Sequence, residues 1–440
     1  MKISILSVTL LLAVQTVSGQ QQPEAWSLSR CINQALTGNL QLKQAALATG
    51  ITQVNREQAL ASRFPVVEAT ARQSFAWSDQ LNNDGTYDFT GSNSSSASIS
   101  SSATLFNGFR KENTIKQSQL NYQSAVLDEE AYRQDITLQV LDSYLQVLYA
   151  GELVENSKNQ LLSTQTQLSL SEERLKLRII SQADFLQVKS QEAAEKLTLA
   201  TAEKQLQLSR LNLMQLMEIP VSDDFTIEKP DFSDAAIQLS GNSLSGVYES
   251  ALASRPEIRN AALQKEIAAY DIQIAKAGYL PSLSINAGLS TQYSSLAENL
   301  KFASQLDHNL SPTAGLTLSI PIFQQKQVKS QVSLARINAS SAEISEQNTR
   351  NQLRKSIETA WTDVVTAEKE FEAGNEKYAA ARASFAVSEE RFAQGIISPV
   401  DFLYEKTSLI NAESNLLQAR YNLIFSYKVI EFYQGKELKL

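Results

Sequence analysis

Two Ser-x-x-Asp motifs, at 181–184 and 398–401, hold the side chains best placed to do chemistry. In such a motif the Ser hydroxyl and the acidic residue three positions on satisfy free amides at the start of a helix, an arrangement called a capping box. The carboxylates of Asp184 and Asp401 also gain from the helix dipole. Two interpretations stay open: the aspartates only cap helices, or they cap helices and also supply negative charge to a site.

Residues for catalysis and metal binding are scarce. One histidine, His308, and one cysteine, Cys31, exclude a Cys/His metal cluster and a disulfide within one chain. The sequence has no phosphate loop, nucleophile elbow or metal-ligand spacing. We therefore predict no enzyme, no cofactor and no bound metal. The net charge of −8 also argues against nucleic-acid binding.

The N-terminus has the three parts of a secretory signal, namely Lys2, an apolar stretch from Ile3 to Val14, and small residues at 17–19. We predict that residues 1–19 are a signal peptide and that the mature chain is exported. No run of 18 apolar residues follows, so no transmembrane helix is predicted. If the chain spans a membrane, it must do so as a closed barrel.

The chain is a tandem duplication. The segment Ser171-Glu172-Glu173-Arg174 recurs 217 residues later at 388–391, and 179–181 and 184–186 recur as 396–398 and 401–403. A chance match does not hold one register over several blocks. We predict a first repeat at 20–219, a connector at 220–246 and a second repeat at 247–440.

Each repeat is predicted to contain a helix, two strands, a long helix and a second helix. The first repeat has them at 30–62, 66–77, 96–106, 111–177 and 184–218, and the second at 247–278, 282–293, 313–320, 325–394 and 399–434. The strands alternate apolar and polar residues, with Phe75, Trp77 and Tyr293 expected at their loop ends as an aromatic girdle. The polar segments 78–95 and 294–312 are expected to be loops. The strand pattern alone fits a membrane barrel and a soluble sandwich edge equally well.

The helix lengths predict how the helices are arranged. Each long helix has roughly 67 to 70 residues, about 100 Å at 1.5 Å per residue. In each repeat the two shorter helices together have 68 residues, so they match the long helix if they stack end to end. Each half should therefore be a long helix, a hairpin turn and a return path completed by two shorter helices.

Four strands cannot close a membrane barrel, because single-chain barrels begin at eight. A trimer gives twelve strands and continues them as a helical tube. The predicted fold class is mainly α with membrane β: a trimeric 12-stranded β-barrel, four strands per subunit, continued by a long α-helical coiled-coil barrel.

The chain resembles the TolC-like outer membrane efflux protein family. The resemblance rests on the duplicated openings at 35–40 and 251–256, Phe64-Pro65 and Leu280-Pro281 before the strands, Leu105-Phe106 and Ile322-Phe323 after them, and the two hairpins. It implies a homotrimer in the outer membrane of a Gram-negative cell, in contact with its lipid, with a periplasmic helical domain. It also implies docking to a periplasmic adaptor (membrane fusion) protein and an inner-membrane pump or ABC exporter.

The resemblance also implies roles for the hairpin residues. An Asp matching Asp401 lines the pore constriction and favours cations, and one matching Asp184 helps to hold the entrance closed. Tyr404 stands where the family has a second acidic ring. Phe392 and Ile397 replace a Tyr and an Arg that bond the neighbouring hairpin, so the polar latch should be different or weaker here.

The hairpin turns are the predicted docking site for the adaptor, because exposed isoleucine pairs mark a partner surface. The candidate residues are Arg178, Ile179, Ile180 and Ser181 in the first turn and Gly395, Ile396, Ile397 and Ser398 in the second. Gly395 suits a left-handed helix cap, whereas the matching Arg178 does not. The rival function is a soluble periplasmic coiled-coil adaptor or scaffold without a pore.

Overall fold

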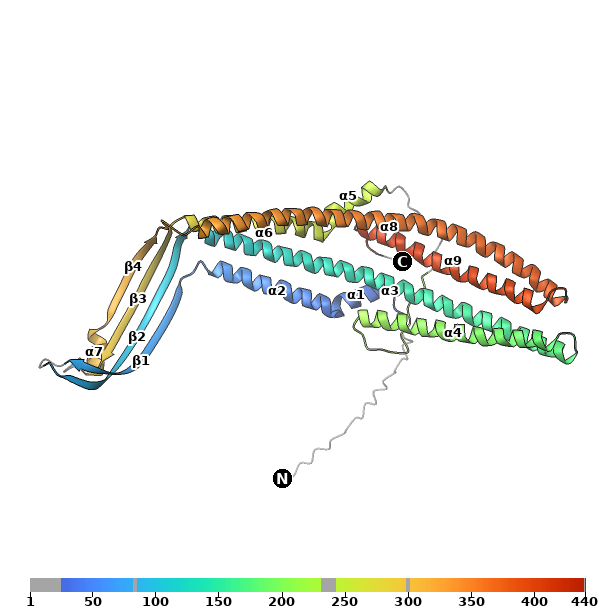
Figure 1. Cartoon of the computed structure of the whole chain (residues 1–440), viewed down its shortest axis with the longest axis horizontal. Coiled ribbons are helices and arrows are strands. Elements are labelled where there is room, and N and C mark those ends of the chain that lie inside the picture. Colours follow the sequence, from blue (N-terminus) through green and yellow to red (C-terminus); the bar gives the residue numbers. More distant parts are fainter. Residues whose placement is uncertain (1–24, 82–84, 231–242, 298–300, 439) are drawn as a thin grey trace, which may run out of the picture.

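The molecule is long and narrow, with a four-stranded sheet at one end and helices running away from it (Figure 1). The computed structural model describes residues 25–81, 85–230, 243–297, 301–438 and 440. The strands are β1 (Val66–Leu81), β2 (Tyr87–Asn107), β3 (Ser282–Ser294) and β4 (Ser311–Ser319). The helices are α1 (Leu28–Gly38), α2 (Leu40–Ala61), α3 (Arg110–Lys176), α4 (Gln182–Leu216), α5 (Leu244–Ser254), α6 (Pro256–Lys276), α7 (Phe302–His308), α8 (Gln327–Ala393) and α9 (Pro399–Tyr433).

The sheet is antiparallel in the order β1-β2-β3-β4. Its register sets Ile99 opposite both Ala69 and Leu289, and Ile285 opposite both Ala103 and Leu316. Residues opposite one another point to the same face, so the predicted alternation produces one apolar face across all four strands. On the other face the hydroxyls of Thr70 and Ser98 lie 2.8 Å apart.

Two predicted loops are largely ordered elements. Segment 78–95 mostly extends β1 to Leu81 and starts β2 at Tyr87, and segment 294–312 contains α7. Phe75 and Trp77 therefore lie inside β1 and not at its end, whereas Tyr293 does lie near the end of β3. The Asn, Asp and Ser content suggested loops, but backbone pairing between neighbouring strands depends little on those side chains.

The predicted long helices are confirmed, since α3 and α8 have 67 residues each. The predicted helices 30–62 and 247–278 are wrong in one respect, because each is broken in two. Asn39 and Arg255 interrupt them with extended ψ values of 128° and 125°. Asn favours the cap position, and the residue before Pro256 is forced out of the helical region.

The first break lies where α4 ends beside α3, and we call this contact the first joint. The side chain of Asn39 donates from Nδ2 to the carbonyl of Leu216, the last residue of α4, at 3.2 Å. Its Oδ1 accepts from the amides of Gln41 and Leu42 at the start of α2. A Cβ on Gly38 would lie only 2.7 Å from the carbonyl of Met217, so glycine permits this close approach. The stacked path α4 plus α2 along α3 is visible in Figure 1.

The second break lies where α9 ends, and we call it the second joint. Nε of the buried Arg255 donates to Oε1 of Glu257 at 2.8 Å. Its guanidinium stands 4.5 Å from the ring centroid of Phe432. Ser250 Oγ donates to the carbonyl of Gln434 at 3.3 Å, which ties α5 to the end of α9.

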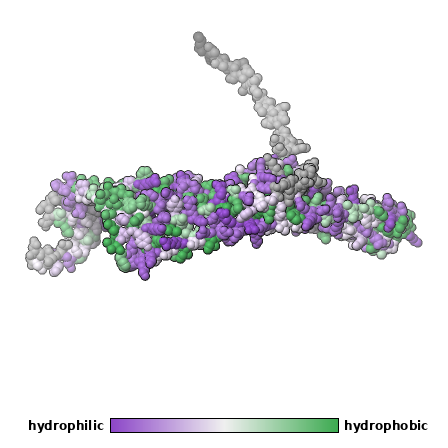
Figure 2. All heavy atoms as spheres, turned by 90° about the horizontal axis from the view of Figure 1, so that it is seen from above, coloured by the Kyte–Doolittle hydropathy of each residue, from purple (hydrophilic) through white to green (hydrophobic). Residues whose placement is uncertain are grey.

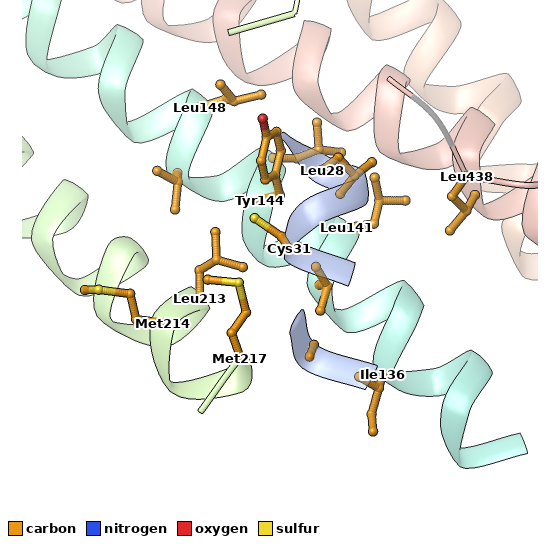
Figure 3. Close-up of a cluster of buried hydrophobic side chains, with 14 of the residues drawn as sticks. Leu28, Cys31, Ile136, Leu141, Tyr144, Leu148, Leu213, Met214, Met217 and Leu438 are labelled. Carbon is orange, nitrogen blue, oxygen red and sulfur yellow. The ribbon is translucent and has the colours of Figure 1, made fainter. Parts of the chain in front are cut away.

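The main hydrophobic core lies at the level of the first joint (Figure 3). Helix α1 contributes Leu28 and Cys31, α3 contributes Leu141 and Tyr144, and Leu213 comes from α4. Tyr144 donates its hydroxyl proton to the carbonyl of Glu228 at 2.6 Å, which fixes the segment after α4 to α3. A second core packs α5 and α6 against α8 and α9. Within the described residues, no helix has the length and apolar character needed to cross a membrane.

Candidate functional site

The two hairpin turns lie together at the end of the molecule opposite the sheet (Figure 1). In each turn the amide two residues beyond the helix cap donates back to the last turn: Ile179 N to Arg174 O at 2.8 Å, and Ile396 N to Arg391 O at 2.9 Å. This bond defines a Schellman motif, which needs a left-handed residue just after the cap. Gly395 fills that position with φ 73°, and Arg178 fills it with φ 59°. Arg178 therefore adopts the left-handed conformation although arginine disfavours it, because the closing bond of the turn holds it there.

Both return helices begin with the predicted serine cap. Ser181 Oγ accepts from the Asp184 amide at 3.1 Å, and the Ser181 amide donates to Asp184 Oδ2 at 3.2 Å, which confirms a full capping box. Ser398 Oγ likewise accepts from the Asp401 amide at 3.2 Å. In both motifs the serine hydroxyl also donates to Oδ2 of the aspartate, at 2.7 Å in the first and 2.8 Å in the second. In the second motif, however, the reciprocal bond from the serine amide is not formed among the described residues. The second motif is therefore half a capping box.

The carboxylates differ in exposure between the turns. Asp401 is exposed, and Tyr404, one helical turn further along α9, is 73% exposed. Residues three apart share a helix face, so these two side chains form one open surface. Asp184 is half-buried.

Only the first isoleucine of each pair is exposed. Ile179 and Ile396 are 66% and 64% exposed. The prediction that Ile180 and Ile397 are exposed is wrong, because both are half-buried and Ile397 packs against an aromatic cluster in its own hairpin. Arg178, Ser181, Gly395 and Ser398 are exposed as well. Each turn thus exposes one of its two isoleucines, and Leu177 and Val400, which flank the turns, are exposed as well.

The aromatic cluster occupies the base of the second hairpin. The rings of Phe392 and Phe402 stack with centroids 4.6 Å apart, and Phe385 lies 5.4 Å from Phe402. Phe392 is 5% exposed, so its side chain serves its own hairpin.

Arg174 links the two hairpins of one chain, a role that the sequence analysis missed. Its guanidinium donates to the carbonyls of Phe392 at 3.4 Å and Ala393 at 3.2 Å, and it stands 5.3 Å from the Phe392 ring centroid. Those carbonyls lie in the last turn of α8, where no further helical amide follows, and the Phe392 carbonyl also accepts from the Gly395 amide at 3.1 Å. The repeated Ser-Glu-Glu-Arg segment contains Arg174, but repetition alone gives no sign of this contact.

The helices form a wall whose two outer edges carry exposed apolar side chains. Near the sheet, α2 contacts α3, α3 contacts α6 and α6 contacts α8, so α2 and α8 are the edges. Edge helix α2 exposes Leu47, Ile51 and Val54, and edge helix α8 exposes Leu334, Ile337 and Ile344. Spacings of three, four and seven are those of a coiled-coil seam. Figure 2 shows hydrophobic patches between polar ones along the length of the molecule.

Comparison with known proteins gives a family match over both repeats. The sequence profile described as "Outer membrane efflux protein" matches residues 31–217 and 247–431. Outer membrane protein TolC of Escherichia coli (strain K12) is 23% identical over 348 residues, which cover 76% of this chain and 68% of TolC. The pyoverdine export outer membrane protein OpmQ of Pseudomonas putida is 26% identical over 307 residues, which cover 68% of this chain and 60% of OpmQ.

Solved structures share the fold. The outer-membrane channel OprN aligns with a TM-score of 0.78 at 19% identity, covering 93% of this chain and 90% of OprN. The CmeC outer membrane channel of Campylobacter jejuni also aligns with a TM-score of 0.78, at 16% identity, covering 99% of this chain and 93% of CmeC.

Proposed function

Because the chain belongs to the outer membrane efflux protein family, we propose that it is the outer membrane exit duct of a tripartite efflux or secretion system. The sheet lies in the outer membrane with its apolar face toward lipid, and the helices extend into the periplasm. Family members are channels, and the proposal assigns no catalytic residue to this chain.

The observation that carries the proposal is that both edges of the subunit are unfinished. Among the described residues, β1 and β4 are the outer strands of a four-stranded sheet, so each pairs with a neighbouring strand along one side only. The edge helices α2 and α8 expose the apolar seams described above. A single partner type, another copy of the same chain, satisfies all four edges at once if β4 pairs with the next β1 and α8 packs on the next α2.

We infer a homotrimer from this geometry and from the family. Three copies give twelve strands, enough to enclose a channel wider than a filled eight-stranded barrel. The same operation makes a helical tube with the hairpin turns at its far mouth. A periplasmic adaptor and an inner-membrane pump or ABC exporter are the proposed partners.

The proposed pore constriction is formed by Asp401, supported by Asp184 and by Tyr404 on the same face of α9. Three copies of the exposed Asp401 around the axis would concentrate negative potential in a narrow mouth and favour cations. The proposed adaptor contacts are Ile179 and Ile396 with the polar turn residues Arg178, Ser181, Gly395 and Ser398. Ile180 and Ile397 would support the turns from beneath.

The domain boundaries stay a proposal: repeats at 20–219 and 247–440 joined by a connector at 220–246. The proposed signal peptide, residues 1–19, lies outside the described residues, as does part of the connector.

Planar lipid films test the proposal. The purified protein should migrate as a trimer in detergent and conduct ions, with a preference for cations. Asp401→Asn should lower that preference, measured from reversal potentials in a salt gradient. Glu172→Gln removes an equal charge from an exposed ion pair on α3 and should leave selectivity unchanged. A monomeric protein, or a silent film, would contradict the duct, and unchanged selectivity in Asp401→Asn would contradict only the constriction.

A further inference from the structure

A buried polar cluster joins three helices a short distance from the hairpin turns, on the side toward the sheet. Nζ of Lys406 on α9 lies 3.4 Å from Oε1 of Glu195 on α4. The same ammonium donates to Thr164 Oγ1 and, at 3.3 Å, to the carbonyl of Gln160, both on α3. Lys406 and Glu195 are only 4% and 5% exposed. We call these residues the buried node.

The buried node connects the two hairpins of one chain. Lys406 lies about two turns of helix after the start of α9, whereas its charge partner belongs to the other hairpin. Closer to the turns, the aromatic cluster of Phe392 and Phe402 lies within the second hairpin alone. The described contact there between the hairpins is the partly exposed Arg174 guanidinium. Among the described residues between the joints and the turns, the buried node is therefore the most deeply buried charged contact between the hairpins.

The two charges in the buried node balance each other, but their hydrogen bonding is incomplete. Burial lowers the pKa of Lys406, and the neighbouring Glu195 raises it again. Glu195 Oε1 also accepts from Gln191 Nε2 at 3.1 Å, but Glu195 Oε2 has no hydrogen-bond partner among the described residues. A buried ion pair of this kind adds little net stability, because desolvation offsets the attraction, yet it strongly favours one packing register. Water reaching the node would solvate both charges and weaken that preference.

We propose that Lys406 is a positioning residue for gating: its pairing with Glu195 holds the two hairpins of each chain in the closed register, and hydration of the pair accompanies their separation. This inference rests on the proposed function as a duct. It differs in its residues from the latch implied by the resemblance, which bonds the neighbouring hairpin through positions that are Phe392 and Ile397 here.

The test compares a broken pair with a replaced pair in the full-length protein. In Lys406→Met, Glu195 has no charge partner while the hairpins are packed, but it is hydrated once they separate. Separation is therefore favoured, and the open probability in planar films should rise at least about tenfold. The double variant Lys406→Met/Glu195→Met fills the same space without charge and should return to low open probability. Lys189→Met changes the repeat-equivalent lysine, which is exposed on α4, and should have no effect.

Each outcome decides between the alternatives. An open probability within about twofold of wild type for a trimeric Lys406→Met protein, or a double variant as leaky as the single one, overturns the inference. If Lys406→Met does not assemble, Glu195→Gln decides, because it keeps an acceptor for Lys406 but removes the charge; raised opening supports the node and unchanged opening overturns it. A wild-type protein that does not conduct would instead overturn the proposed function.

Discussion

The two joints answer the same geometric need with different chemistry. Asn39 and Arg255 are equivalent positions, 216 residues apart, and both interrupt a helix where another helix ends. The first joint uses a neutral amide that bonds backbone groups on both helices, and the second uses a buried guanidinium between Glu257 and two aromatic rings. Duplication has thus kept the place where the chain breaks, while the side chains that close the gap have diverged.

The turns and the strand-to-helix junctions extend the comparison. Gly108 and Phe109, between β2 and α3, have positive φ values, and so do their equivalents Gln325 and Lys326 between β4 and α8. As with Gly395 and Arg178, one repeat has glycine where the other has a residue that disfavours the conformation. The backbone path is therefore imposed by tertiary packing, and local preference adjusts only its stability.

The largest expected effect is at the second joint. Arg255→Ala removes an ion pair and the stacking on Phe432 and leaves Glu257 partly buried without its partner. We expect a loss of about 3–5 kcal/mol in the free energy of unfolding. Unfolding in detergent, monitored by far-ultraviolet circular dichroism, measures this loss. Arg259→Ala, on the exposed side of α6, is the matched control and should change little. Equal losses in the two variants would show that Arg255 stabilises the second joint no more than an exposed arginine does.

Asn39→Ala should have a smaller effect at the first joint. It removes the cap of α2 and the bond to Leu216, a loss of about 1–2 kcal/mol. Gln41→Ala, exposed at the start of α2, serves as control. A loss as large as that of Arg255→Ala would mean that the Asn39 amide and the Arg255 guanidinium contribute equally to the free energy of unfolding, which would contradict the expected difference between the joints.

The junctions offer a gain in stability. Gln325→Gly relieves a left-handed residue with φ 50° and should raise stability by roughly 0.5–1 kcal/mol. The reverse change, Gly108→Ala, should be harmful, because its Cβ would lie 2.7 Å from the carbonyl of Ala277. The thermal midpoints of the two variants should therefore move in opposite directions.

The smallest effect is a difference in pH dependence. Partial burial raises the pKa of Asp135 on α3, and Arg255 lowers it. Without Arg255 the pKa of Asp135 rises further, so the Asp135 carboxyl keeps its proton to higher pH in the folded variant than in the unfolded chain. The stability of the variant therefore falls relative to that of the wild type as pH increases from about 4. The loss in Arg255→Ala should be larger at neutral pH than in acid, and the loss in Asn39→Ala should not vary. Solvent reaches part of the Asp135 side chain, so screening keeps the effect small.

The sequence predicts what periodicity and repetition control. The 67-residue helices, the stacking of shorter helices and the apolar face of the sheet follow from spacing alone. It did not predict contacts between residues far apart in the chain, such as Arg174 with the end of α8 or Lys406 with Glu195, because nothing in either local pattern identifies the partner. The breaks at Asn39 and Arg255 had local cues, an Asn cap and a following proline, which the continuous apolar pattern outweighed. The length of β1 and β2 was missed because pairing overrides a polar composition.

The burial of Cys31 has a practical consequence for spectroscopy. It is the one cysteine of the chain, its side chain is fully enclosed by α1 and the core, and burial raises the pKa of its thiol to about 12. Only the thiolate reacts readily with alkylating reagents. Spin labels or fluorophores can therefore be attached to cysteines introduced at the two turns while the native residue stays in place, so that the distance between the turns can be followed without altering the packing at mid-length.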